Sequence, residues 1–339
     1  MTPEEAVGEV LAALDADPRR RGPVAIAVSG GGDSMALLHA TAAVARRAVL
    51  AVTVDHGLRP EAAEEARLVG RACEALGVPH ETLRWDGGGR GNLQERAREA
   101  RRRLIGAWAR GHGAATVFLG HTADDQAETV LLRLARGSGV DGLAGMPASF
   151  VAEGVGWDRP LLGLGREVLR VWLRARRIGW VEDPSNEDPR FDRARARAMM
   201  DRLGELGLTR ERLVRTAGHM ARARVSLASE AREAAGRLLQ EDGRDLLIPR
   251  HLLLAFDQGD TSGRILAAAL RWVGGDRCRP RWESLRRLAA VVAAGRAATL
   301  AGCRVAPEGG WARVSPEARN PSAPVRAPGE RFAESADFG

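Results

Sequence analysis

Short segments rich in apolar residues alternate along the first half of the chain with longer segments of helical periodicity. The segments at 24–28, 48–54 and 115–119 are apolar and bounded by turn residues, which predicts buried strands, and 80–85 predicts a further strand. Between them, apolar residues recur every three or four positions, as on one face of a helix. Alternating strands and helices of this kind predict an α/β fold, with a doubly wound parallel sheet covered by helices on both faces.

The second half of the chain has a different pattern. One long basic helix is predicted over 209–237, followed by helical periodicity at 265–273 and 285–292 and a short strand or strand pair near 299–305. We therefore expect a smaller, mainly helical second domain. The expected division is an α/β domain over 1–205, a basic connector helix over 206–240, a small domain over 241–306, and a poorly packed tail over 307–339 that is rich in Pro, Gly and Ala.

Composition narrows the class of protein only slightly. The net charge of +7 favours a polyanionic partner, although the absence of lysine indicates a compositional bias towards arginine. Three widely spaced cysteines, Cys73, Cys278 and Cys303, form no C-x-x-C pair, so a zinc ribbon is not indicated. The chain shows neither a signal peptide nor an apolar run near the roughly 18 residues of a membrane span. We expect a cytoplasmic protein without a membrane partner.

A glycine-rich turn follows the first predicted strand and precedes a helix. Backbone N–H groups converge at such a turn and the helix dipole adds positive charge, which suits a phosphate group. A Walker A loop is excluded because it needs a lysine, and a dinucleotide-binding loop lacks its third glycine. An ordinary strand-to-helix turn remains the alternative. The candidate phosphate-binding residues are Ser29, Gly30, Gly31, Gly32, Asp33 and Ser34.

A second polar motif, 120–129, follows the last strand of the predicted parallel sheet. Its acidic residues suit the first turn of a helix, which explains part of the pattern. Asp125 and Glu128 lie three residues apart and therefore share one helix face. Because strands of a parallel sheet end at one edge, we expect His121 and this carboxylate pair near the phosphate loop. Two carboxylates there require a cation, either magnesium or an ammonium substrate.

These motifs resemble a known family. The run S-G-G-x-D-S at 29–34 is similar to the pyrophosphate loop of the N-type ATP pyrophosphatases, or PP-loop proteins. Further segments occur in the order found in the tRNA(Ile)-lysidine synthetases, and the resemblance covers about residues 20–200. These segments are 54–59, 120–129, 136–146, 159–162 and 180–186.

The resemblance implies a carbon–nitrogen ligase that acts on tRNA(Ile) with a CAU anticodon. In that family, ATP adenylates the C2 oxygen of cytidine 34, and L-lysine then displaces AMP to give lysidine. Pyrophosphate is released, and the tRNA changes from reading AUG as methionine to reading AUA as isoleucine. The implied cofactors are ATP and Mg²⁺, and the small domain over 241–306 is implied to bind tRNA.

The resemblance also assigns roles to individual residues. Asp33, His121 and Arg98 are implied to be catalytic, and Asp33 is also the implied magnesium ligand. Asp125 and Glu128 are implied to bind the amino groups of lysine. The segment 191–197 also resembles a family motif, and its Arg193 and Arg197 are expected to contact tRNA phosphates. A plain helix N-terminus packed on the catalytic domain is the alternative for this segment. The separate roles of His121 and Arg98 stay open.

Other functions are compatible with parts of this pattern. A tRNA thiolase shares the phosphate loop, but the cysteine pair that it needs is missing here. A basic RNA-binding protein with an inactive nucleotide loop is a further alternative. The sequence also leaves open whether the chain forms a homodimer.

Overall fold

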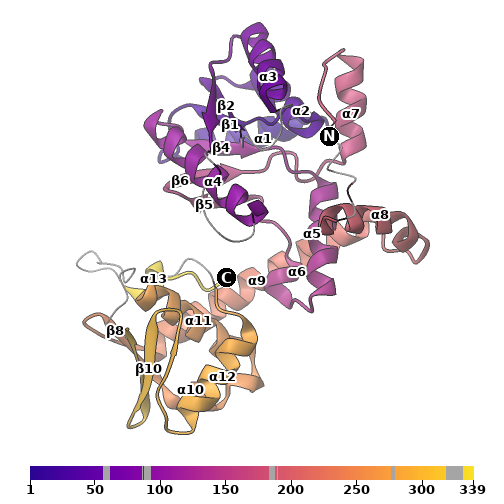
Figure 1. The fold of residues 1–339 in the computed structure, drawn as a ribbon. Coiled ribbons are helices and arrows are strands. Elements are labelled where there is room, and N and C mark those ends of the chain that lie inside the picture. Colours follow the sequence, from indigo (N-terminus) through magenta and orange to yellow (C-terminus); the bar gives the residue numbers. More distant parts are fainter. Residues whose placement is uncertain are drawn as a thin grey trace. The chain divides into compact units, whose positions relative to one another are not determined.

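The chain folds into two compact units. The computed structural model describes residues 1–55, 62–85, 87, 93–182, 188, 190–275, 279–317 and 331–339. The first unit spans Met1–His219 and the second Met220–Gly339, and Figure 1 shows the elements of each.

A six-stranded sheet forms the centre of the first unit. Its strand order is β3-β2-β1-β4-β6-β5, and every neighbouring pair is parallel except β5 with β6. The predicted doubly wound sheet is thereby confirmed, whereas the antiparallel β5–β6 pair at one edge was not predicted. The strands are β1 (Val24–Ala27), β2 (Val49–Asp55), β3 (His80–Arg84), β4 (Thr116–Leu119), β5 (Ser149–Ala152) and β6 (Val155–Asp158).

Helices of the first unit cover both faces of this sheet. Residues Val24 and Ile26 of β1 pack in one apolar core with α1, α2 and α7, whereas Ala25 and Ala27 pack on the other face against α4. Side chains of a strand alternate between its faces, so a strand apolar throughout must lie between two helical layers. The helices are α1 (Pro3–Ala16), α2 (Gly32–Val44), α3 (Ala62–Leu76), α4 (Leu93–Gly111), α5 (Ala123–Ala135), α6 (Val140–Leu143), α7 (Arg166–Ala175) and α8 (Asp192–Glu205).

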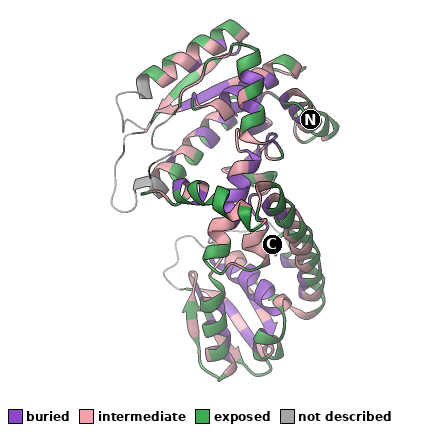
Figure 2. Ribbon diagram, turned by 90° about the vertical axis from the view of Figure 1, so that its right-hand side faces the viewer, coloured by how far each residue is buried: buried purple, intermediate pink, exposed green. Residues whose placement is uncertain are grey.

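The burial pattern follows the same layers. Figure 2 shows buried residues along the central strands and the inward faces of the helices, with exposed residues on the outward faces. A small separate core joins α5 to the start of the long helix α9 (Arg210–Leu238) through Ala127, Val130, Leu213 and Ala217. This core holds α5, which carries the second polar motif, against the helix predicted over 209–237. That helix is observed as α9 (Arg210–Leu238), and the boundary between the two units falls inside it.

The second unit packs helices on a five-stranded antiparallel sheet. Its strand order is β7-β8-β11-β10-β9. The predicted helices are present, but the unit contains more sheet than the mainly helical domain we expected. The elements are β7 (Gln240–Asp242), β8 (Asp245–Pro249), α10 (Arg250–Leu254), α11 (Asp260–Gly274), α12 (Trp282–Ala293), β9 (Ala298–Leu300), β10 (Cys303–Glu308), β11 (Trp311–Pro316) and α13 (Phe332–Ser335).

The prediction of a poorly packed tail over 307–339 is wrong for its described residues. Strand β11 lies inside the sheet between β8 and β10, where Ala312 and Val314 are fully buried. Phe332 and Phe338 enter the core of the second unit, and their rings meet edge to face with centroids 5.3 Å apart. Local Pro and Gly content concealed these contacts because the apolar residues that make them are isolated in the sequence. Residues 318–330 lie outside the described part of the chain.

Candidate active site

The phosphate loop connects β1 to α2. Ser34 stabilises its turn, since the Ser34 hydroxyl accepts a hydrogen bond from the Ser29 N–H at 3.1 Å and donates one to the Gly31 carbonyl at 2.9 Å. The backbone of the loop also pairs with the segment after α7, where the Val181 N–H donates to the Gly30 carbonyl at 2.9 Å. Helix α2 begins at Gly32, so its first N–H groups have no partner within the helix and are available to a phosphate group.

The backbone favours glycine at two positions in and beside this loop. Gly30 has a φ of +84°, a conformation that other residues rarely adopt. Gly120 follows β4 and lies against the loop, because a Cβ atom there would be 3.0 Å from both the N and Cα atoms of Ser34. The two polar motifs therefore meet at one edge of the sheet, as the strand order of a parallel sheet predicts.

Three carboxylates from α2 and α5 surround one guanidinium group. Nε of Arg166 lies 3.1 Å from Oδ2 of Asp33, and its Nη2 lies 3.2 Å from Oδ1 of Asp125. The third contact joins Nη1 of Arg166 to Oε1 of Glu128 at 3.7 Å. We call Asp33, Asp125 and Glu128 the carboxylate cluster. The predicted proximity of these residues is thus observed in the structure.

Arg166, the cation of this cluster, was not identified from the sequence. It is the first residue of α7, and its backbone N–H donates to Oδ2 of Asp124 at 2.7 Å. The same aspartate pairs with Arg210 at 3.2 Å. In the sequence, the pair Gly165–Arg166 indicates the start of a helix and nothing about a functional role. Arg166 contacts residues up to 133 positions away in the chain, and no pattern in the sequence predicts those contacts.

The pKa values of the three carboxyl groups are shifted in different directions. Burial raises the pKa of Asp33 above its ordinary value, and Arg166 offsets only part of that effect. Burial also raises the pKa of Glu128, whose exposed fraction is 2%. For Asp125 burial acts in the same direction, but Arg166 and the Thr122 N–H outweigh it and hold the pKa below its ordinary value. The N–H and hydroxyl of Thr122 both donate to Oδ2 of Asp125, at 2.8 and 2.9 Å.

Glu128 has one occupied and one unoccupied carboxylate oxygen. Its Oε1 accepts a hydrogen bond from Nε of Arg197 at 2.9 Å. Its Oε2 is buried and has no hydrogen-bond partner among the described residues. A buried carboxylate oxygen without a donor is energetically costly, so this atom is a favourable acceptor for a ligand N–H group.

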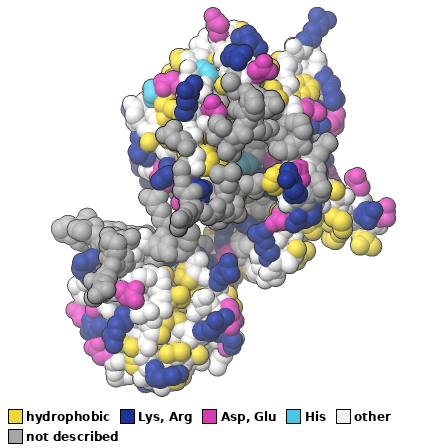
Figure 3. Space-filling model, in the orientation of Figure 1, with side chains coloured by type: hydrophobic (Ala, Val, Ile, Leu, Met, Phe, Trp, Pro, Cys, Tyr) yellow, Lys and Arg dark blue, Asp and Glu magenta, His cyan; other side chains and the backbone are white. Residues whose placement is uncertain are grey.

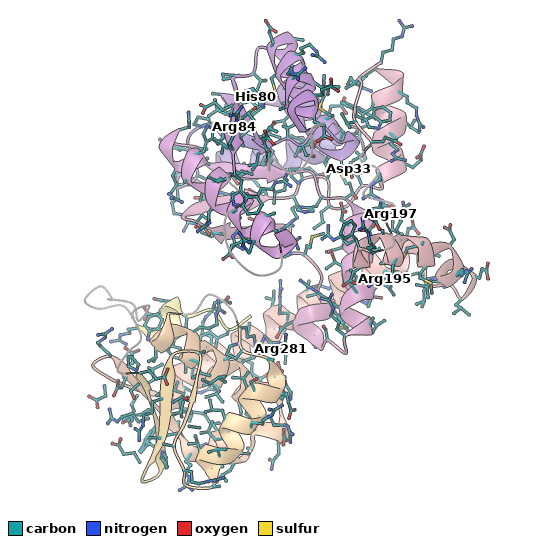
Figure 4. All side chains as sticks on the ribbon, in the orientation of Figure 1. Asp33, His80, Arg84, Arg195, Arg197 and Arg281 are labelled. Atoms are coloured by element: carbon teal, nitrogen blue, oxygen red, sulfur yellow. The ribbon has the colours of Figure 1, made fainter. Side chains whose placement is uncertain are left out.

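The predicted tRNA-contacting arginines on α8 occupy different environments. Arg197 is engaged with Glu128, so its guanidinium belongs to the carboxylate cluster rather than to an exposed phosphate-binding surface. Figure 4 labels it beside Arg195, which pairs with Asp192 on the same helix. Arg193 instead lies near Arg98 and Arg159. Burial is the largest cause of the lowered pKa of Arg98, and repulsion from Arg193 comes next. For Arg159, burial again lowers the pKa most, followed by repulsion from Arg98 and then from Arg193. We call Arg98, Arg159 and Arg193 the arginine cluster.

His121 lies between the two clusters, at the end of β4. Its Nδ1 accepts a hydrogen bond from Nε of Arg159 at 3.1 Å. Burial lowers the pKa of His121 to about 3, and the positive charges of Arg159 and Arg193 act in the same direction. The imidazole is therefore neutral at physiological pH.

Further features of the described residues concern metal sites, membrane-spanning helices, charged patches and cysteine pairs. Within them, no group of three His, Cys, Asp or Glu side chains is placed to hold a metal ion. No described helix is long and apolar enough to cross a membrane. Arg and acidic side chains are interspersed over the face in Figure 3, so net charge alone does not locate the site. Cys73 and Cys303 are buried in separate cores, whereas Cys278 lies outside the described residues.

The fold and the phosphate loop define a PP-loop ATP-binding protein, and the family described as the PP-loop domain matches residues 4–203. Similarity to curated proteins narrows this class. The chain is 44% identical over 311 residues to the tRNA(Ile)-lysidine synthase of Ruegeria pomeroyi, covering 90% of this chain and 73% of that protein. It is 41% identical to the enzyme of that name from Methylobacterium nodulans, covering 88% and 92%. The chain belongs to the tRNA(Ile)-lysidine synthase family.

A solved structure confirms the fold independently. The U34-tRNA thiolase NcsA from Methanococcus maripaludis superposes with a TM-score of 0.54 at 18% identity, covering 65% of this chain and 78% of that one. At that identity the likeness concerns the fold alone.

Proposed function

We propose that this protein joins L-lysine to C2 of cytidine 34 in the CAU anticodon of tRNA(Ile). ATP first adenylates the C2 oxygen, which turns a poor leaving group into a good one. The lysine amine then displaces AMP, and the products are lysidine, AMP and pyrophosphate. The proposal rests on family membership and on the meeting of a phosphate loop with a carboxylate cluster at one edge of the sheet.

The observation that carries the lysine half of the proposal is the unpartnered Oε2 of Glu128. An ammonium group has three donors and a positive charge, so it would satisfy this oxygen and interact with the ionised Asp125. The distance of 3.7 Å between Arg166 and Glu128 is longer than a hydrogen bond, so the guanidinium leaves that carboxylate incompletely satisfied. Arg197 holds the other oxygen of Glu128 and thereby positions the carboxylate.

The phosphate loop fits ATP. The N–H groups at the start of α2 would hold the pyrophosphate portion, since the Ser29–Ser34 bond closes the turn around them. Magnesium in such sites is usually bound by one or two carboxylates together with substrate phosphates, so a protein cage of three ligands is not required. Asp33 is the proposed protein ligand, and magnesium there would offset negative charge on the phosphates. Arg166 competes for the same carboxylate until the metal and nucleotide arrive.

The arginine cluster is the proposed contact for the nucleotide and the tRNA backbone. Arg98 and Arg193 repel each other in the free protein, and a phosphate group between them would relieve that repulsion. Arg98 is proposed to face the adenylated cytidine, and Arg193 a tRNA phosphate. Arg197, which we expected to contact tRNA, is reassigned to the lysine pocket. The region 241–306 is proposed to bind the body of the tRNA.

The test is formation of lysidine by the purified protein. Unmodified tRNA(Ile), ATP, Mg²⁺ and L-lysine are supplied, and the digested tRNA is analysed by nucleoside mass spectrometry. Lysidine that depends on all four components supports the proposal, whereas its absence with active ATP turnover contradicts it. Product formed only with a sulfur donor would indicate a thiolase instead, and RNA binding without ATP turnover would indicate an inactive nucleotide loop.

The location of the protein and its oligomeric state are the two further expectations. We expect the protein in the cytoplasm, where its tRNA, ATP and lysine are present. Sedimentation velocity would decide between a monomer and the homodimer that the sequence left open.

A further inference from the structure

One hydrogen bond determines which nitrogen of His121 carries the proton. All N–H groups of arginine are donors, and the Nε of Arg159 faces Nδ1 of His121 at 3.1 Å. Nδ1 must therefore be the acceptor and carries no proton. A neutral imidazole has one N–H group, so the proton lies on Nε2.

Arg159 is itself held rigidly by the chain before and around the β5–β6 pair. Its Nη1 donates to the Pro147 carbonyl at 2.6 Å, and its guanidinium lies over the Phe150 ring at 4.6 Å from the centroid. Its backbone N–H donates to the Ala148 carbonyl at 2.8 Å. The donor that faces His121 is therefore fixed in direction, since three other contacts restrain the arginine.

The charged groups around His121 lie on α4, α5 and α8 and in the segment that follows β6. Asp125 on α5 favours a second proton on the ring, whereas Arg159, Arg193 on α8 and Arg101 on α4 oppose it. Burial opposes it more strongly than any of these, so the pKa falls to about 3 and the ring stays neutral. A neutral ring whose Nδ1 is already occupied acts neither as an imidazolium acid nor as a base at Nδ1.

The residue before His121 in the chain lies against the phosphate loop. A Cβ atom on that residue, Gly120, would lie 3.0–3.1 Å from backbone atoms of Asp33 and Ser34. Strands β4 and β1, which end at this edge, are paired in register at Leu119 and Ala27. His121 thus directly follows the residue that contacts the loop, at the edge of the sheet where the substrate phosphates are proposed to bind.

We propose that His121 serves as a fixed hydrogen-bond donor through Nε2 to a phosphate or carbonyl oxygen of the substrate, and that Arg159 is the positioning residue that enforces this tautomer. The proposal rests on the function proposed above for its substrate, but the tautomer is a property of the free protein. Hydrogen bonds aimed at an oxygen that gains negative charge stabilise the transition state without exchange of the proton.

The first test measures the tautomer directly. Long-range ¹H–¹⁵N correlation spectra of the ¹⁵N-histidine-labelled protein distinguish the protonated from the unprotonated ring nitrogen, and His121→Asn identifies the signal among the seven histidines. We expect Nε2–H with a bare Nδ1, unchanged from neutral pH down to about pH 5, well below the ordinary pKa of about 6.5. A protonated Nδ1, or a ring that titrates near its ordinary value, would overturn the proposal.

The second test removes the arginine. In Arg159→Met the His121 ring should populate both tautomers, and its pKa should rise towards the ordinary value. The ring then gains a proton at acidic pH, so kcat should fall there, which we do not expect in the unmodified protein. We expect a loss of kcat of about 10- to 100-fold, with a smaller change in the KM for lysine. Arg159→Lys retains a donor and a charge and should recover part of the loss.

The control is Arg174→Met on α7, an exposed arginine paired with Glu167. It should leave the tautomer and the pH profile unchanged. An Arg159→Met variant with an unaltered tautomer and pH profile would refute the positioning role. If Arg159→Met does not fold, the spectra of the unmodified protein and of Arg159→Lys still decide. Failure of the unmodified protein to form lysidine would refute the proposed function while leaving the tautomer result intact.

Discussion

Arg166 donates from Nε to Oδ2 of Asp33 at 3.1 Å, which joins the first turn of α7 to the first turn of α2. The same guanidinium bonds to Asp125 at 3.2 Å, so one cation connects the phosphate loop to the proposed lysine pocket. The proposed sites for the two substrates therefore share one counter-ion in the free protein. Lysine or magnesium would bind to carboxylates that Arg166 already orients.

Glu128→Gln should weaken lysine use specifically. The amide keeps the shape of the side chain but removes the charge that pairs with an ammonium group. Because a charge-assisted hydrogen bond contributes about 1.5–3 kcal/mol, the KM for lysine should rise about 10- to 150-fold. Steady-state kinetics with varied lysine and with varied ATP measure the change. Glu167→Gln, an exposed glutamate on α7, is the control. An unchanged KM for lysine would remove Glu128 from the pocket.

The pH dependence of lysine use should follow the same carboxyl group. Burial raises the pKa of Glu128, so its protonated fraction grows as the pH falls through that raised value. A protonated carboxyl group does not pair with an ammonium group, so the KM for lysine should increase towards acidic pH. In the Glu128→Gln variant the KM for lysine should no longer increase towards acidic pH. If the KM for lysine depends on pH equally in both proteins, another group causes the increase.

Ser34→Ala should weaken ATP use. Its hydroxyl makes the two hydrogen bonds that close the phosphate loop, with the Ser29 N–H and the Gly31 carbonyl. Without it, the loop N–H groups lose their fixed direction, and we expect the KM for ATP to rise about tenfold, corresponding to about 1.4 kcal/mol. ATP–pyrophosphate exchange or ATP-dependent kinetics report the effect. Ser226→Ala on α9, an exposed residue of the second unit, should change neither KM nor kcat.

Gly120→Ala should impair both stability and activity. The added methyl group would lie 3.0 Å from the backbone of Ser34, so the loop must shift. We expect a loss of about 1–3 kcal/mol in the free energy of unfolding, together with a lower kcat. Chemical denaturation and kinetics measure the two effects. Gly8→Ala in α1 is the matched control, because nothing lies within 4 Å of its Cβ position and alanine favours a helix. A Gly120→Ala protein as stable and active as the control would contradict the close contact.

Arg193→Ala should weaken tRNA binding and reduce its dependence on salt. Loss of one phosphate contact lowers the slope of log K against log salt by about 1 and weakens binding by a similar amount for cognate and other tRNAs. Filter binding at several salt concentrations measures both. Arg195→Ala on the same helix is the control, since that guanidinium is paired with Asp192. If the two variants have the same salt slope, Arg193 does not contact a phosphate.

The sequence was sufficient to predict elements that depend only on residues close together in the chain. The strand at 24–28, the glycine turn after it and the helix of α5 with its Thr122 cap are each specified by residues within one or two turns. The meeting of Asp33 with Asp125 was also predictable, because strands of a parallel sheet end at one edge. By contrast, the strand β11 and the packed residues after 330 were missed, since isolated apolar residues such as Phe332 show no periodicity.

The sequence by itself determined the α/β class, the phosphate loop and the residue types of the carboxylate cluster. Only the tertiary structure showed that Arg166 is the cation at its centre, that Arg197 holds Glu128, and that Arg159 donates a hydrogen bond to Nδ1 of His121. The physical reason is the range of the interactions. Helix and strand periodicity arises from neighbours along the chain, whereas a guanidinium selects its partner from segments that meet only after the sheet has formed.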